Sequence, residues 1–159
     1  MRPCVALALT LAAMLSGRSA AAQDFAVRLG LAQAHITEVF IGCHAKGSEG
    51  YDRELDDFAP PPGIDTGYVG FVPKTRLPLL YKDIRGPKGP HEWTLQVRPA
   101  KERPVVVSWA PKTLPAGWTF TVVQGDTVTA MADTASLTVA AAGTLSFRAV
   151  EKAPAATAP

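Results

Sequence analysis

Short runs of β-branched and aromatic residues recur roughly every 8 to 14 residues along this 159-residue chain, and turn-forming residues separate them. After the first twenty-two residues, no window of about a dozen residues has the apolar period of an amphipathic helix. This spacing predicts an all-β protein, an antiparallel β-sandwich. The predicted strands span residues 25–31, 36–41, 67–72, 92–97, 105–109, 118–123, 128–132, 136–139 and 144–150.

Apolar and polar residues alternate along three of these predicted strands, and this alternation indicates which side chains face the core. The inward-facing residues are predicted to be Trp93, Leu95, Val97, Trp118, Phe120, Val122, Leu145 and Phe147. We therefore expect at least two of the three tryptophans to point into the core. The segment Gln124-Gly125-Asp126 predicts a hairpin turn.

The first twenty-two residues have the three parts of a secretory signal peptide. Arg2 provides a charged start, residues 5–15 form an apolar run, and Ala20-Ala21-Ala22 is a small-residue cleavage site. The run of about 11 residues is shorter than the roughly 20 that a membrane-spanning helix needs. The sequence thus predicts a signal peptide over residues 1–22, a β-sandwich domain over 23–150 and a disordered Ala/Pro-rich tail over 151–159. The expected location is secreted or periplasmic, with the cell surface as an alternative.

The balance of charges limits the expected partners. The chain has 16 basic and 14 acidic residues, and loss of Arg2 and Arg18 with the signal would make the two counts equal. Without a basic cluster, the sequence argues against nucleic acid and against an anionic membrane surface as partners. The remaining stretch of about 137 residues suits one domain. We expect a monomer without a membrane span that contacts a protein or a glycan at the cell envelope.

Cysteine and histidine residues give little support to a bound cofactor. Cys43 is the one cysteine after residue 22, which predicts a buried thiol, with an intermolecular disulfide as the alternative. Cys43-His44 is half of a haem-attachment C-x-x-C-H motif, but its first cysteine is missing. His35, His44 and His91 lack the paired spacing of zinc ligands. No cofactor is therefore predicted, apart from the calcium ion considered next.

The segment from residue 51 to 57 carries the most suggestive local chemistry, because its carboxylates alternate in a way that could wrap a hard cation. The candidate calcium ligands are Asp52, Glu54, Asp56 and Asp57. An EF-hand loop starting at Asp52 would need glycine at its sixth position and glutamate at its twelfth, and the chain has neither there. The alternative is that Asp52 and Asp56 cap turns by accepting hydrogen bonds from backbone N–H groups.

Three tyrosines, Tyr51, Tyr68 and Tyr81, lie near predicted loops and are the candidate ligand-binding residues. Catalysis has less support, because no G-x-S-x-G or other local signature of an activated nucleophile is present. Asp56 and Asp83 could form a carboxylate pair for glycoside cleavage, but 14 scattered acidic residues make some such pair expected. The sequence predicts no enzyme and no catalytic residues, with a small secreted hydrolase as the least favoured alternative.

Several local motifs follow one another in a characteristic order between residues 25 and 150. They are Gly50-Tyr51-Asp52, Leu55-Asp56, Tyr68, Asp83-Ile84-Arg85, Trp93, Ser108-Trp109, Leu114-Pro115-Ala116-Gly117-Trp118 and the closing residues 145–150. In this order they resemble an immunoglobulin-like β-sandwich domain found near the C-terminus of secreted bacterial surface proteins, often before a type IX-like sorting segment. The resemblance implies a non-catalytic module for structural, adhesion or protein-interaction roles. The alternative is a carbohydrate-binding module, assisted by calcium.

Overall fold

The computed structural model describes residues 24–153. Within that range the chain is all-β, with eleven strands and one short 3-10 helix, η1 (Pro111–Thr113). The strands are β1 (Phe25–Ala32), β2 (Glu38–Cys43), β3 (Asp57–Phe58), β4 (Tyr68–Phe71), β5 (Leu80–Arg85), β6 (His91–Arg98), β7 (Val105–Ser108), β8 (Trp118–Gln124), β9 (Thr127–Ala130), β10 (Ser136–Val139) and β11 (Gly143–Glu151). The expected signal peptide and residues 154–159 of the expected tail lie outside the described residues. No helix between residues 24 and 153 is long and apolar enough to cross a membrane.

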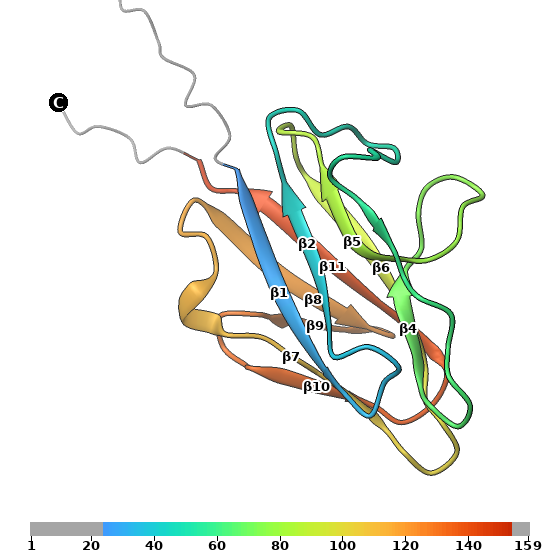
Figure 1. Ribbon diagram of the computed structural model, residues 1–159. Helices are drawn as coiled ribbons and strands as arrows, with labels where there is room; N and C mark the ends of the chain where they lie inside the picture. The colour runs from blue at the N-terminus through green and yellow to red at the C-terminus, as the bar shows by residue number, and fades with distance from the viewer. Residues whose placement is uncertain (1–23, 154–159) are drawn as a thin grey trace, which may run out of the picture.

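The strands form one hydrogen-bonded sheet in the order β10-β7-β1-β2-β5-β4-β6-β11-β8-β9, and β3 pairs with β5 off this path. The sheet curls into a half-barrel, so that β1 lies across from β8 (Figure 1). Aromatic rings close the space between the two sides. Phe25 of β1 meets Trp118 and Phe120 of β8 edge to face, with ring centroids 5.0 and 5.5 Å apart. A single apolar core therefore lies inside the curl.

The alternation in the sequence correctly predicts the residues that fill this core. The eight side chains predicted to face inward on β6, β8 and β11 are all buried. All three tryptophans are buried as well, since Trp93, Trp109 and Trp118 are 0%, 6% and 4% exposed. The indole N–H groups that could suffer from this burial are satisfied, because Trp109 donates to the carbonyl of Met131 at 2.8 Å and Trp93 to that of Asp83 at 3.1 Å. The tryptophans thus build the core and leave no indole on the surface.

The predicted hairpin turn is also confirmed. β8 and β9 are joined by Gly125 and Asp126, and the last residue of β8, Gln124, pairs with Thr127. Gly125 has φ +58°, a conformation that is strained for any residue with a Cβ atom. Glycine at the first central position of a two-residue loop matches the backbone twist of an antiparallel hairpin.

The all-β class is confirmed, but the sheet is mixed instead of purely antiparallel. β2 and β5 run parallel, with Ile41 opposite Asp83 and Cys43 opposite Arg85. A parallel neighbour needs a long crossover, and the chain between β2 and β5 supplies one, because it contains β3 and β4. The sequence prediction missed β5 entirely, and this strand connects the two sides of the sheet.

Candidate functional site

A buried ion pair lies on β5. Asp83 and Arg85 are 2% and 3% exposed, and they face the core because their partners on β2, Ile41 and Cys43, are core residues. Arg85 Nε lies 2.7 Å from Asp83 Oδ1, and Arg85 Nη2 donates to Asp83 Oδ2 at 2.8 Å. Only the Nη2 contact is a hydrogen bond; within the described residues Arg85 Nε has no hydrogen-bond partner, so one charge-assisted hydrogen bond and the attraction of the two charges hold the pair together. Burial nevertheless raises the pKa of Asp83 to about 6, against the lowering effect of Arg85.

Glu49 fastens the loop that follows β2 over this ion pair. Its carboxylate forms an ion pair with Lys74 and lies 3.9 Å from Arg85 Nη1 and 3.5 Å from His91 Nδ1. Arg85 Nη1 also donates to the backbone carbonyl of Glu49 at 3.2 Å. Burial by itself would raise the pKa of the Glu49 carboxyl, but the hydrogen bond and charge of Lys74, with the charges of Arg85 and His91, lower it. A carboxylate that is half exposed thereby holds a surface loop against the buried guanidinium of Arg85.

His91 of β6 is enclosed between two indole rings. Its ring centroid lies 5.5 Å from that of Trp93 and 5.6 Å from that of Trp118, and its side chain is fully buried. Within the described part of the chain, neither ring nitrogen has a hydrogen-bond partner. Burial is the main cause that lowers the pKa of His91, so its imidazole is neutral in the folded protein at neutral pH.

Two of the four candidate calcium ligands are occupied by backbone groups. Asp52 Oδ2 accepts the N–H of Ser48 at 2.6 Å, and Asp56 Oδ2 accepts the N–H of Asp52 at 2.7 Å. Asp56 Oδ1 accepts the N–H of Ile84 in β5 at 2.7 Å, and burial raises the pKa of this carboxyl. These bonds are the turn-capping role that the sequence left open beside the calcium hypothesis, and they tie the acidic loop to β5.

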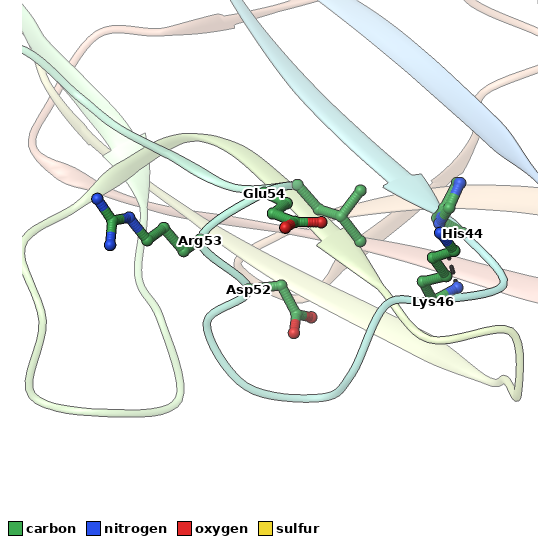
Figure 2. A pocket seen from close by; sticks show the side chains of 6 residues that line it. His44, Lys46, Asp52, Arg53 and Glu54 are labelled. Carbon is green, nitrogen blue, oxygen red and sulfur yellow. Dashed lines mark hydrogen bonds between the residues drawn. The ribbon is translucent and has the colours of Figure 1, made fainter.

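The other two carboxylates, those of Glu54 and Asp57, accept no backbone hydrogen bond in the described part of the chain. Glu54 lines a polar surface hollow of about 280 Å³ together with His44, Lys46, Asp52, Arg53 and Leu55 (Figure 2). Asp57 Oδ2 accepts a hydrogen bond from the Tyr81 hydroxyl at 3.3 Å and lies 3.9 Å from Lys82 Nζ. Among residues 24–153, no three histidine, cysteine, aspartate or glutamate side chains are grouped so that they could hold a metal ion. Calcium binding by Asp52, Glu54, Asp56 and Asp57 therefore stays a prediction.

Tyr51 and Tyr81 contact β3, whereas Tyr68 begins β4. Tyr51 stacks on Phe58 with centroids 4.8 Å apart and planes 13° from parallel, and Phe58 is 42% exposed. Tyr81 lines a groove of about 360 Å³ together with His35, Ile36, Thr37, Glu38 and Pro60. Tyr68 packs on His35 at 4.9 Å between ring centroids. We call the stacked pair Tyr51 and Phe58, together with Tyr81, the aromatic surface.

Cys43 at the end of β2 is a buried thiol, as the sequence-based interpretation expects. It is 1% exposed, forms no disulfide with any residue between 24 and 153, and donates from Sγ to the carbonyl of Gly86 at 3.1 Å. Burial raises the pKa of the thiol and keeps it protonated. The side chain of the neighbouring His44 lies near Asp24, with Nε2 3.5 Å from Asp24 Oδ2.

Sequence reasoning did not identify the group formed by Glu49, Asp83, Arg85 and His91. A signal for part of it exists, because residues two apart on a strand share one face, so an Asp-x-Arg sequence places both charges together. That signal depends on recognising residues 80–85 as a strand. No family model, curated protein or solved structure matches this chain. The class that the structure defines is thus an all-β protein whose acidic loop is anchored on a buried ion pair.

Proposed function

We propose that this chain is an exported, non-catalytic β-domain that acts by contact with another protein at the cell envelope. The signal-peptide pattern over residues 1–22 supports export. The finer fold class, an immunoglobulin-like β-sandwich, is part of the same proposal. It is supported by the two opposed sides of the curled sheet, which pack together through aromatic residues such as Phe25 and Trp118.

The shape of the buried charged group favours a structural role over a catalytic one. The space beside Asp83, Arg85 and Glu49 measures about 10 Å³, which is room for about one water molecule. A substrate could not reach Asp83 or Arg85, which are 2% and 3% exposed, without a rearrangement of the loop above them. Their contacts instead hold that loop on the sheet, which is a rigid platform for binding.

The single observation that carries the proposal is Phe58 of β3, which is 42% exposed and stacks on the half-buried Tyr51 of the anchored loop. Aromatic side chains are the usual anchors of protein interfaces, since they bury a large area with few rotatable bonds. A loop that is fixed before binding loses little conformational entropy when the partner docks. Glu49, Asp52 and Asp56 provide that fixation through the contacts described above.

The test is quantitative retention of envelope proteins by the immobilised mature protein, residues 23–159, followed by chemical cross-linking to map the contact. We expect Phe58→Ala to lower retention at least roughly tenfold, the effect of an interface anchor worth more than about 1.4 kcal/mol. Val150→Ala is the matched control, because Val150 is also exposed, at 51%, but lies on β11 away from the loop. Equal retention by the two variants contradicts the proposed surface. Turnover of a glycan or peptide library that one point change abolishes contradicts the non-catalytic role.

A second candidate function is carbohydrate binding in the groove lined by Tyr81 and Glu38. This groove combines an aromatic ring that could stack on a pyranose with a carboxylate that could accept hydrogen bonds from hydroxyls. A glycan array probed with the wild type and with Tyr81→Ala tests it, since binding in the groove should be lost in the variant. Loss of binding on chelation supports calcium assistance, and a flat calorimetric calcium titration contradicts it. A blank array contradicts the sugar-binding function itself.

A further inference from the structure

The two strands at the ends of the sheet, β9 and β10, differ in how their outer edges are satisfied. Just before β10, the N–H of Trp109 donates to the carbonyl of Ala135 at 2.8 Å, so Ala135 directs its backbone groups towards the chain of β7. Because this direction alternates along an antiparallel strand, the backbone N–H and carbonyl groups of Ser136 and Thr138 point away from β7. Both of these outward carbonyls accept side-chain bonds. Ser136 O accepts from Thr134 Oγ1 at 3.3 Å, and Thr138 O accepts from Gln124 Nε2 at 3.3 Å. The two outward carbonyls of β10 are therefore capped by the chain itself.

The β9 edge lacks such caps at its centre. Just after β9, the N–H of Met131 donates to the carbonyl of Phe120 at 3.0 Å. By the same alternation, the backbone N–H and carbonyl groups of Val128 and Ala130 point away from β8. The Ala130 carbonyl accepts the N–H of Asp133 at 3.1 Å. For Val128, neither the N–H nor the carbonyl has a partner among residues 24–153, and the residue is 62% exposed.

The sequence of β9 does nothing to discourage pairing. Thr-Val-Thr-Ala contains no charge and no proline, the two features that proteins commonly use to protect an open edge. Its residues are β-branched or small, and they suit a cross-strand neighbour. The open edge at Val128 is therefore chemically ready to accept one more strand.

We propose that the strand that pairs with this edge is β9 of a second copy of the chain, antiparallel about a two-fold axis at Val128. In that register the N–H and carbonyl of Val128 exchange two hydrogen bonds with those of its copy. Thr127 lies opposite Thr129, and Asp126 lies opposite Ala130, so that no like charges face each other. The edge is self-complementary, which is the argument for a second copy as the occupant.

This pairing does not rest on the proposed function, because β9 lies apart from the aromatic surface. The sequence alone led us to expect a monomer, and the experiment distinguishes the two. A contact of four residues per chain is much smaller than a standard interface, so the dimer should be weak and dependent on concentration.

Sedimentation equilibrium of the mature protein from about 10 μM to about 1 mM tests the proposal at concentrations where weak association becomes measurable. The average mass of the wild type should rise towards that of a dimer. Val128→Pro removes only an outward N–H, which an edge strand tolerates, and should weaken association at least about tenfold with little change in melting temperature. Val128→Lys should do the same by placing two lysines face to face across the axis.

Thr138→Pro is the matched control, since it removes an outward N–H from the capped β10 edge and should leave association unchanged. Far-ultraviolet circular dichroism of each variant shows that the sheet is intact. A wild type that stays monomeric throughout this range contradicts the proposal. So does association that survives in both Val128 variants, or that is lost equally in the control.

Discussion

Two regions of the sheet face the same core but are stabilised in different ways. One is formed by β6, β11 and β8, and the other is the junction of β2 with β5. β8 and β11 contribute alternating apolar side chains such as Val122 and Phe147, both fully buried. β5 contributes Asp83 and Arg85 at equally buried positions. An apolar side chain contributes by its own burial, whereas a buried charge is tolerated only together with its partner. The comparison shows that equal burial need not mean equal energetics.

The largest effect is expected for Arg85→Met, which keeps most of the side-chain volume and removes the charge. Asp83 is then left in the core without its partner, and we expect the free energy of unfolding to fall by about 3–5 kcal/mol. Urea denaturation followed by tryptophan fluorescence measures this loss. A loss below about 1 kcal/mol would mean that water reaches Asp83 and solvates it.

On the apolar side, Val122→Ala removes about two methylene equivalents from a residue that is 0% exposed. Transfer and cavity effects together predict a loss of about 2–3 kcal/mol in the same urea experiment. The substitution neither adds nor removes a titrating group, so the loss in free energy of unfolding should be the same at pH 5 and pH 7. A loss that differed between pH 5 and pH 7 would contradict the view that only the charged region makes stability depend on pH.

The pH dependence of stability sharpens the comparison further, because His91 and Asp83 act with opposite signs. The pKa of His91 is lowered by burial, so below its ordinary value of about 6.5 the unfolded chain binds a proton that the folded protein resists. This contribution reduces stability as the pH falls, by up to about 1.4 kcal/mol per pH unit. The pKa of Asp83 is raised to about 6, so its contribution is fully present below its ordinary value and is lost as the pH rises through 6.

His91→Phe isolates these two contributions, because phenylalanine fills the space between Trp93 and Trp118 without titrating. Between pH 7 and pH 5, the variant should lose less stability than the wild type, or gain some. The nearby charged groups, Glu49, Lys74 and Arg85, remain unchanged in this comparison. Parallel pH profiles for the variant and the wild type would show that His91 does not titrate against the fold.

The smallest effect on the free energy of unfolding is expected for Glu49, the half-exposed member of the charged group. Glu49→Gln keeps the shape of the side chain and removes the charge that faces Lys74 and Arg85. The carboxylate is half exposed, so solvent screens it, and we expect a loss of no more than about 1 kcal/mol. Hydrogen exchange in the loop of residues 44–56 should nonetheless become faster. Unchanged exchange there would contradict the anchoring role of Glu49.

The sequence predicts the apolar region well and the charged junction poorly, for one physical reason. Alternation of Trp93, Leu95 and Val97 with polar residues follows directly from burial of one sheet face. β5 breaks that rule, because its buried face includes Asp83 and Arg85, and charged residues normally indicate solvent. Its partner Glu49 lies in a loop distant in sequence, so no local pattern brings the group together.

The same reason explains the result for the candidate site. The composition of the acidic segment is compatible with a metal site and with turn caps, and only the fold shows that Asp52 and Asp56 accept hydrogen bonds from backbone N–H groups. Tyr51, Tyr68 and Tyr81 are half buried, and their role in ligand binding stays a prediction; Phe58, which stacks on Tyr51 in the aromatic surface, has no signal in the sequence.

The central claim is that Asp83 and Arg85 stabilise the β2–β5 junction only as a pair. A double-mutant cycle with Asp83→Leu, Arg85→Met and the combined variant, followed by urea denaturation at pH 7, tests it most directly. We expect a large loss in each single variant and a much smaller loss in the double variant, with a coupling energy above about 2 kcal/mol. Losses that simply add, so that the double variant is the least stable of the three, would contradict the account.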